Sequence, residues 1–216
     1  MLIKNAKIFD NDFHIQEWDL RVSDGKISAL AAWGKLEANQ GEEVLDLKGM
    51  TLAPGMLDIH IHGAVGMDTM DGTEDSLEAI SRFLASKGVT SFLPTTMTMG
   101  FEDIAQVFKL KPTLTGANML GFHMEGPFIN VTRKGAQNER YVRTATLAEM
   151  ARYGEDANVR IITLAPETEG ALDFIREMSR KTVISIGHTD ATYDEAKAAI
   201  AAGATSVTHC FNAMPM

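Results

Sequence analysis

The hydrophobic and polar positions follow two different patterns along the chain, and the change lies near residue 50. Residues 1–50 contain short runs in which apolar and polar residues alternate, such as LIKNAKIF and IQEWDLRV. Turn signals separate these runs, among them Asn11-Asp12 and Asp24-Gly25. Alternation with period two is typical of strands that bury one face. We therefore expect a small N-terminal β domain over residues 1–50, part of a β-sandwich.

From residue 51 to residue 216, apolar strand-like runs alternate with amphipathic helices. Six such runs begin near residues 56, 91, 119, 160, 183 and 206, so one repeat takes about 30 residues. A (β/α)8 barrel of about 250 residues uses about 31 residues per unit. The spacing therefore predicts an α/β fold, an incomplete (β/α)8 TIM-type barrel with six of its eight strands in residues 51–216.

Two of the predicted helices begin with capping-box signals. Thr146 with Glu149, and Thr192 with Glu195, each place a hydroxyl residue three positions before a glutamate. The turn after the first barrel strand, HGAVGMDTMDG, contains neither a G-x-G-x-x-G fingerprint nor a P-loop. This disfavours a nucleotide-binding, doubly wound sheet and favours the barrel.

Composition narrows the class of protein further. The chain is 45% hydrophobic and carries a net charge of −9, which disfavours binding to nucleic acid or to anionic membrane. Its single cysteine, Cys210, excludes an internal disulfide framework. There is no signal-peptide pattern and no apolar run of about 18 residues, so we expect a cytoplasmic protein without a membrane span.

The stretch LDIHIHG places two imidazoles on one strand. Because side chains alternate along a strand, His60 and His62 point to the same side. They lie at the carboxyl end of the first barrel strand, the rim at which (β/α)8 enzymes build their active sites. An H-x-H pair alone is weak support for a metal site.

Other barrel strands end in residues of the same kind. His123 and Glu125 lie in LGFHMEGP, His188 ends VISIGH, and His209 lies in SVTH. Buried carboxylates and imidazoles are costly unless paired, and a divalent cation is a partner that several of them can share. We therefore expect a metal site at the rim, the alternative being core histidines with ordinary hydrogen bonds. His123 is a candidate hydrogen-bond partner of the ligands rather than a ligand.

These motifs resemble a known family. H-I-H-G, H-M-E-G-P, G-H-T and T-H-C-F-N-A-M are similar to motifs of the amidohydrolase superfamily, and within it of the N-acetylglucosamine-6-phosphate deacetylases. The resemblance implies metal-dependent hydrolysis of the acetamide of N-acetylglucosamine 6-phosphate to glucosamine 6-phosphate and acetate, a step of amino-sugar catabolism. Several relatives bridge their metals with a carbamylated lysine at the end of strand four. RIITLAPE has no lysine there, and the resemblance implies Glu125 as the bridge.

The resemblance also implies residue roles. Glu125, His188 and His209 would hold the main metal, and His60 and His62 a second one shared through Glu125. One or two divalent ions are expected, zinc first, with iron, manganese and cobalt as alternatives. The residues implied to lie against the sugar phosphate are Ala136, Gln137, Asn212 and Ala213.

A basic loop gives separate support for a phosphorylated substrate. TRKGAQNERYVR, residues 132–143, carries Arg133, Lys134, Arg140 and Arg143 in an otherwise acidic chain. Arg133 and Lys134 are the first candidates for phosphate contacts. The alternative is an ordinary solvated loop or an oligomer contact.

Part of the family's machinery has no counterpart in the sequence. The catalytic aspartate that the resemblance implies on strand eight is missing, as are two β/α units, so we expect a truncated chain with little or no activity by itself. The full-length form is expected to be a homodimer. Two alternatives stay open: an amidohydrolase for cyclic amides or N-acyl amino acids, and a non-catalytic metal-binding fragment.

Overall fold

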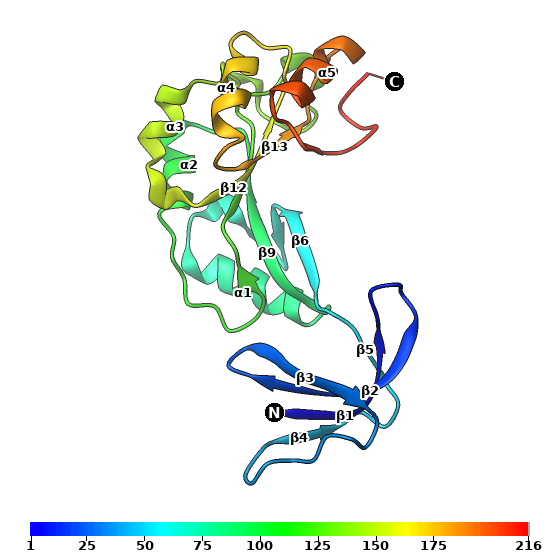
Figure 1. The fold of residues 1–216 in the computed structure, drawn as a ribbon. Helices are drawn as coiled ribbons and strands as arrows, with labels where there is room; N and C mark the ends of the chain where they lie inside the picture. Colours follow the sequence, from blue (N-terminus) through cyan, green and yellow to red (C-terminus); the bar gives the residue numbers. More distant parts are fainter. Residues whose placement is uncertain (216) are drawn as a thin grey trace. The chain divides into compact units, whose positions relative to one another are not determined.

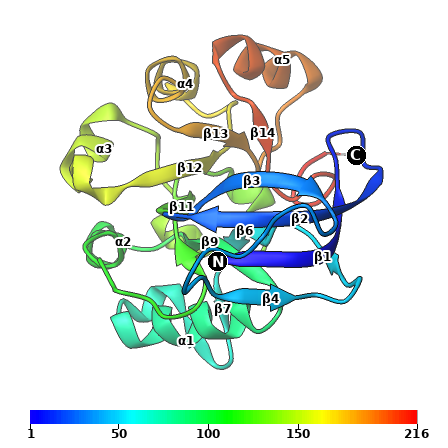
Figure 2. The same ribbon diagram turned by 60° about the horizontal axis from the view of Figure 1, so that its bottom comes forward.

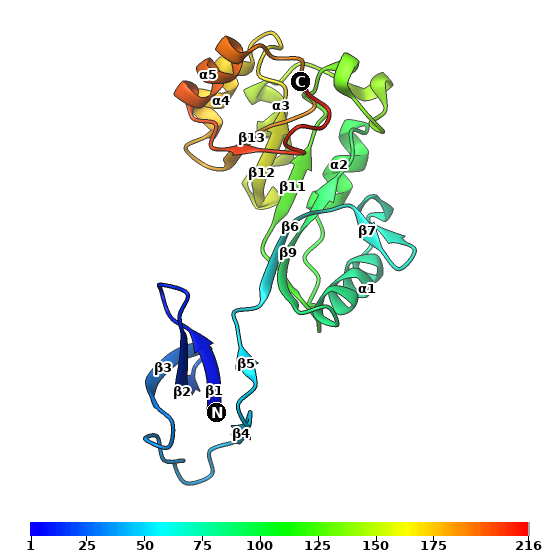
Figure 3. The same cartoon turned by 90° about the vertical axis from the view of Figure 1, so that its right-hand side faces the viewer.

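The computed structural model describes residues 1–215, and the chain divides between Pro54 and Gly55 into two compact units. The first unit is a single five-stranded sheet of order β3-β2-β1-β4, with β5 also paired to β1. Figure 3 shows β1 beside β2 in this sheet. The strands are β1 (Leu2–Phe9), β2 (Ile15–Ser23), β3 (Lys26–Ala32), β4 (Val44–Asp46) and β5 (Thr51–Leu52).

The alternation in these strands produces a one-sided core. Ile3, Ala6 and Leu20 are buried together. The carboxylate of Asp19 is also buried, and it accepts hydrogen bonds from the backbone N–H groups of Asn5 and Gly34 at 3.0 and 2.7 Å. The small N-terminal β unit expected from the sequence is confirmed.

The second unit is a curled parallel sheet covered by helices. Six successive strands run β6-β9-β11-β12-β13-β14, every pair is parallel, and the short β10 also pairs with β9. Figure 2 shows these strands as an arc with α1 to α5 following one another along its outer side. The predicted six-strand part of a barrel is confirmed.

The elements of this unit follow in chain order (Figure 1). Its strands are β6 (Met56–Ile61), β7 (Gly63–Ala64), β8 (Met67–Asp68), β9 (Val89–Thr96), β10 (Asn118–Met119), β11 (Phe122–Glu125), β12 (Val159–Leu164), β13 (Val183–Ile186) and β14 (Ser206–Val207). Its α-helices are α1 (Glu74–Ala85), α2 (Phe101–Phe108), α3 (Leu147–Tyr153), α4 (Ala171–Met178) and α5 (Tyr193–Ala202). Four short 3-10 turns are η1 (Thr69–Asp71), η2 (Val131–Arg133), η3 (Glu139–Tyr141) and η4 (Glu155–Ala157).

The strands of this sheet are nearly continuous apolar runs because helices cover their outer face. Phe122, Ile162 and Ile184 are fully buried in the principal core, where Phe128 also packs edge-on against Phe174 of α4. Interior-facing positions instead carry small polar side chains such as Thr163 and Ser185, both buried. The outer face thus stabilises the sheet, and the inner face is left for polar groups.

One of the two predicted capping boxes forms. Thr192 accepts a hydrogen bond from the backbone of Glu195, and the Glu195 carboxylate accepts one from the backbone of Thr192. The capping box predicted at Thr146 is wrong, because only the first of its two hydrogen bonds forms. Thr146 accepts from the Glu149 N–H at 3.1 Å, but the Glu149 carboxylate accepts from Arg143 Nε at 2.8 and 3.0 Å, and this charged donor takes the place of the backbone.

Among residues 1–215, no helix combines the length and the apolar character that crossing a membrane requires.

The packing of β12 predicts a large cost for truncating its central side chain. Ile162→Ala should lower the free energy of unfolding of the second unit by about 2–5 kcal/mol, because it leaves a cavity at a fully buried position. The five α-helices found in residues 1–215 all lie in this unit, so helix circular dichroism during denaturation measures it. Ile200→Ala, at a site 61% exposed on α5, should change stability by no more than about 0.5 kcal/mol. Equal effects of the two substitutions would contradict this packing.

The first unit should depend on pH through the Arg21–Glu42 pair. The Arg21 guanidinium, 2.8 Å from Glu42, and the backbone N–H of Asn39 lower the pKa of Glu42 to about 2. A lowered carboxyl pKa stabilises the fold above the ordinary value of 4.5, and this stabilisation disappears as the pH falls through about 2. Glu42→Gln should therefore be less stable than the natural chain near neutral pH and equal to it at the acidic end. Trp18 and Trp33 both lie in this unit, so tryptophan fluorescence measures its unfolding, with the exposed Glu43→Gln as control.

Candidate metal centre

The carboxyl ends of four parallel strands bring the candidate ligands together. His60 lies in β6 with His62 just after it, Glu125 is the last residue of β11, and His188 and His209 follow β13 and β14 by two residues. The ligand atoms of Glu125, His188 and His209 lie within 4.8 Å of one another, and so do those of His60, His62 and Glu125. The convergence that the strand pattern predicts is present.

Glu125 is the centre of this arrangement and is almost completely buried. Its Oε1 atom lies 2.7 Å from His209 Nε2, 3.2 Å from His188 Nε2 and 3.4 Å from His60 Nε2. Its Oε2 atom lies 3.0 Å from His62 Nε2. One carboxylate therefore faces four imidazoles, each through the same ring nitrogen.

Backbone carbonyls fix how two of these imidazoles carry their protons. His62 Nδ1 lies 3.1 Å from the carbonyl oxygen of Thr95, and His188 Nδ1 lies 2.9 Å from that of Arg133. A carbonyl only accepts, so each Nδ1 must donate, and in the neutral ring Nε2 then presents a lone pair to Glu125. A lone pair against a carboxylate oxygen is repulsive unless a proton or a cation lies between them. The donor set therefore fits a shared divalent ion.

The pKa values of these groups follow from the same contacts. Burial opposes ionisation of Glu125, but the bonds from His188 and His62 outweigh it and hold the pKa of the carboxyl far below its usual range. Burial also disfavours charged His62 and His188, yet Glu125 more than compensates and raises the pKa of each.

His60 behaves differently because burial dominates and lowers its pKa to about 4. Its Nε2 atom is buried and has no hydrogen-bond partner. A neutral imidazole with an unsatisfied buried nitrogen is costly unless that nitrogen binds something, and a metal ion satisfies it.

Two of the candidate ligands have strained backbones. His188 has φ of 49° and His209 has φ of 54°, in the left-handed region that side chains other than glycine seldom adopt. Such conformations cost about 1–3 kcal/mol each and persist only where the surroundings hold them. The strain marks the turns after β13 and β14 as places where geometry is maintained at the expense of stability.

His123 uses both of its ring nitrogens within the protein. Nδ1 donates to the carbonyl of Ile59 at 2.8 Å, so Nε2 accepts from Thr163 Oγ1 at 2.7 Å. Neither nitrogen is left for an ion, and the ring instead fixes the strand beside His60.

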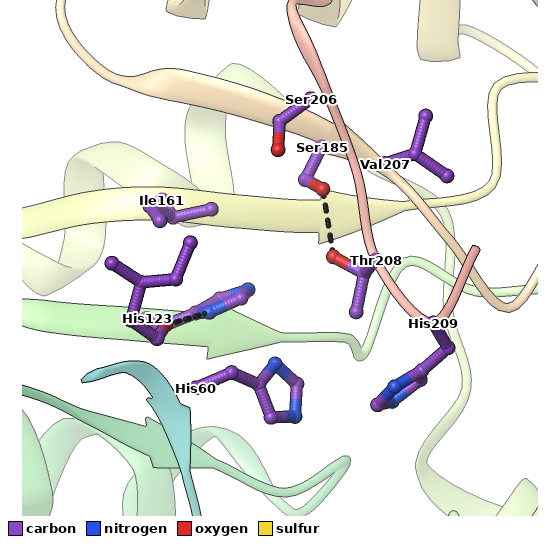
Figure 4. A pocket seen from close by; sticks show the side chains of 9 residues that line it. His60, His123, Ile161, Ser185, Ser206, Val207, Thr208 and His209 are labelled. Carbon is purple, nitrogen blue, oxygen red and sulfur yellow. Dashed lines mark hydrogen bonds between the residues drawn. The ribbon is translucent and has the colours of Figure 1, made fainter. Parts of the chain in front are cut away.

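A row of hydroxyls continues from His123 across the interior. Thr163 Oγ1 lies 2.7 Å from Thr208 Oγ1, which lies 2.7 Å from Ser185 Oγ. Ser185 and Thr208 of this row line the pocket shown in Figure 4 together with His60, His123 and His209, and its volume is about 330 Å³. Sequence reasoning missed this row. Its signal was a hydroxyl residue as the third residue of each of the runs IITL, VISI and SVTH.

The residues expected near a sugar phosphate lie around this centre. Gln137 is 3% exposed, donates from Nε2 to Glu125 Oε2 at 2.6 Å and accepts the Thr98 N–H at 2.6 Å. Ala136 beside it is exposed. The carbonyl of Ala213 accepts the Thr189 N–H at 3.1 Å, and the adjacent Asn212 is exposed.

The basic loop is mostly engaged with carboxylates. Arg133 pairs with Asp190 at 2.8 Å, and Lys134 lies 3.7 Å from Glu139. Arg143 is partly buried, pairs with Glu149 and donates to the carbonyls of Met99 and Tyr141. Arg140 stands 6.0 Å from the ring centre of Tyr141. Arg143 thus stabilises the loop, whereas Arg133 and Lys134 keep exposed fractions of 39% and 35%.

A further acidic group, Asp10 with Asp12 and His14, lies in the turn between β1 and β2. Asp10 Oδ1 there accepts the backbone N–H groups of Asp12 and His14 at 3.0 and 2.9 Å. This pattern stabilises a turn without needing an ion.

Comparison with known proteins gives a consistent result. The chain is 36% identical over 225 residues to N-acetylglucosamine-6-phosphate deacetylase of Bacillus subtilis (strain 168), covering 99% of this chain and 57% of the relative. It is 38% identical over 199 residues to the deacetylase of the same name from Vibrio furnissii, covering 88% of this chain and 49% of the relative.

Among solved structures, N-acetylglucosamine-6-phosphate deacetylase from Pasteurella multocida matches with a TM-score of 0.86 at 30% identity. The match covers 98% of this chain and 57% of that one. This chain thus spans about half the length of the relatives it matches. The model of the amidohydrolase family matches residues 51–216, the whole of the parallel sheet with its ligand-bearing strand ends. The chain therefore belongs to the amidohydrolase family.

Proposed function

We propose that this chain provides the metal-binding part of an N-acetylglucosamine-6-phosphate deacetylase. The reaction is hydrolysis of the substrate acetamide, which yields glucosamine 6-phosphate and acetate. The observation that carries the proposal is the convergence of four imidazoles on the buried carboxylate of Glu125. The deacetylase names of the relatives support the choice of substrate within the amidohydrolase family.

Glu125, His188 and His209 would hold the main ion, and His60 and His62 a second ion through Glu125. Zinc is the first choice, because imidazole nitrogens and carboxylate oxygens are its usual ligands in proteins. Iron, manganese and cobalt also accept these ligands and remain the alternatives. A divalent ion held by these ligands would lower the pKa of water, so that hydroxide, which attacks an amide far better than water does, would be available near neutral pH.

The residues of the chain itself orient this site. Gln137 fixes Glu125 through Oε2, and His123 fixes the strand that carries His60. Ala136, Gln137, Asn212 and Ala213 are proposed to lie against the sugar phosphate, as the family resemblance implies. The resemblance implies a catalytic aspartate on strand eight of the full barrel, and we propose that residues 1–216 contain no counterpart of it. We therefore propose low activity for this stretch alone, and a homodimer for the full-length protein.

Arg133 and Lys134 are proposed to contact the phosphate. Both are partly exposed, and their present partners, Asp190 and Glu139, are exposed too. Such surface ion pairs contribute about 0–1 kcal/mol, so a phosphate dianion can compete for these cations.

Removing the central carboxylate tests the metal site. Glu125→Gln should weaken zinc binding by about 100-fold or more, since even indirect partners of ligands change metal affinity by about 10- to 100-fold. Competition with a chromophoric chelator measures the affinity, and elemental analysis gives the stoichiometry. His14→Gln, at the exposed histidine of the first unit, should bind zinc as the natural chain does. Equal zinc binding by Glu125→Gln and the natural chain would contradict the proposed ligands.

Ligand titration tests the substrate. The zinc-loaded chain should bind N-acetylglucosamine 6-phosphate more tightly than N-acetylglucosamine, and replacing Arg133 and Lys134 by alanine should weaken binding of the phosphorylated sugar by about tenfold or more. The same double variant should bind N-acetylglucosamine unchanged, and Arg180→Ala, on the exposed pair with Glu177, should change neither. Tighter binding or faster hydrolysis of a cyclic amide or an N-acyl amino acid would favour a different amidohydrolase.

A further inference from the structure

The loops after β11, β12 and β13 meet at the carboxylate of Glu167. Its Oε1 atom accepts the side-chain N–H of Asn130 at 2.9 Å and the backbone N–H of Asp190 at 2.6 Å. Its Oε2 atom accepts the hydroxyl of Thr189. We call Asn130, Glu167, Thr189 and Asp190 the Glu167 cluster. It joins three loops of the barrel rim through one side chain.

The Glu167 cluster contacts His188 through a hydrogen bond to its carbonyl and through the chain that follows it. The carbonyl of His188 accepts the backbone N–H of Asn130 at 2.9 Å, and Thr189 and Asp190 follow His188 directly in the chain. The His188 ring donates from Nδ1 to the carbonyl of Arg133, whose side chain in turn donates to Asp190 Oδ1 at 2.8 Å. The contacts of His188 therefore lead to the Glu167 cluster twice, from its backbone through Asn130 and from its ring through Arg133 and Asp190.

This restraint matters because His188 has an unfavourable backbone. Its φ of 49° lies in the left-handed region, and a residue stays there only where neighbouring contacts compensate the cost. Two of the three hydrogen bonds to Glu167 come from Thr189 and Asp190, the two residues after His188, and the third comes from Asn130, whose backbone N–H also binds the His188 carbonyl. Together they provide such contacts. Without them the turn has a more favourable conformation available, and Nε2 of His188 would move away from Glu125.

We propose that Glu167 is a positioning residue that holds His188 in the geometry of a metal ligand. The inference rests on the proposed metal site and deepens it. Glu167 itself contacts neither an ion nor a reacting atom in this account, and it acts only through the loop that carries His188.

Hydrogen-bond chemistry distinguishes this role from a need for negative charge. In Glu167→Gln, the amide oxygen can still accept from Asn130 and Asp190, and the amide nitrogen can donate to the Thr189 hydroxyl, which also accepts. Glu167→Ala removes all three bonds and leaves the Asp190 N–H without its partner. The glutamine variant should therefore keep the three hydrogen bonds that the alanine variant loses.

Two measurements on the purified chain test the proposal. In a chelator competition, Glu167→Ala should bind zinc about 10- to 100-fold more weakly than the natural chain, while Glu167→Gln should stay close to it. In amide hydrogen exchange without metal, Asp190 should exchange faster in Glu167→Ala and unchanged in Glu167→Gln. Glu169→Ala, at an exposed glutamate on the same loop, should match the natural chain in both measurements.

The outcomes separate this inference from the proposed function. If the natural chain binds zinc through Glu125 and Glu167→Ala binds it equally well, the positioning role is overturned and the metal site stands. If the natural chain binds no zinc, the proposed metal site fails, and unchanged Asp190 exchange would overturn the role of Glu167 as well.

If Glu167→Ala loses its helix circular dichroism, Thr189→Val replaces it. At nearly constant shape, this variant removes the bond to Glu167 Oε2 and the one that the Thr189 hydroxyl accepts from the Ala191 N–H at 3.0 Å. It should weaken zinc binding in the same direction, and equal binding would overturn the role.

Discussion

The structure of the barrel rim depends on one buried negative charge. Glu125 is held at the end of β11 with both oxygens surrounded by ring nitrogens and an amide. A carboxylate is expensive to bury, and its cost is offset only by groups that bring positive charge or hydrogen bonds to it. The four histidines satisfy that requirement, and they come from three separate strand ends, those of β6, β13 and β14. Assembly of the site therefore requires the parallel sheet to be folded.

Much of the fold followed from periodicity. The spacing of the apolar runs predicted six parallel strands, and the strand ends predicted which polar side chains would meet, because parallel strands place their carboxyl ends at one rim. His60, Glu125, His188 and His209 were found in this way. The small β unit followed from alternation within residues 1–50.

Contacts between side chains were harder to predict. Whether Glu149 caps its own helix or pairs with Arg143 depends on a loop that only the folded chain brings close. The same is true of Gln137, whose amide reaches Glu125, and of Thr163, Ser185 and Thr208, which are ordinary β-strand residues until the sheet curls. Glu167 belongs to this class as well, because its three partners lie 22, 23 and 37 residues away.

The identity of the residue at position 137 has an electrostatic consequence. Its amide gives Glu125 a short hydrogen bond but no net charge, unlike the ammonium or guanidinium that commonly accompanies a buried acid. A lysine or arginine there would neutralise the carboxylate permanently and would repel an incoming ion. With a glutamine, the position of the carboxylate is fixed and no permanent cation stands beside it, so an incoming ion has only the protons of the neighbouring imidazoles to displace.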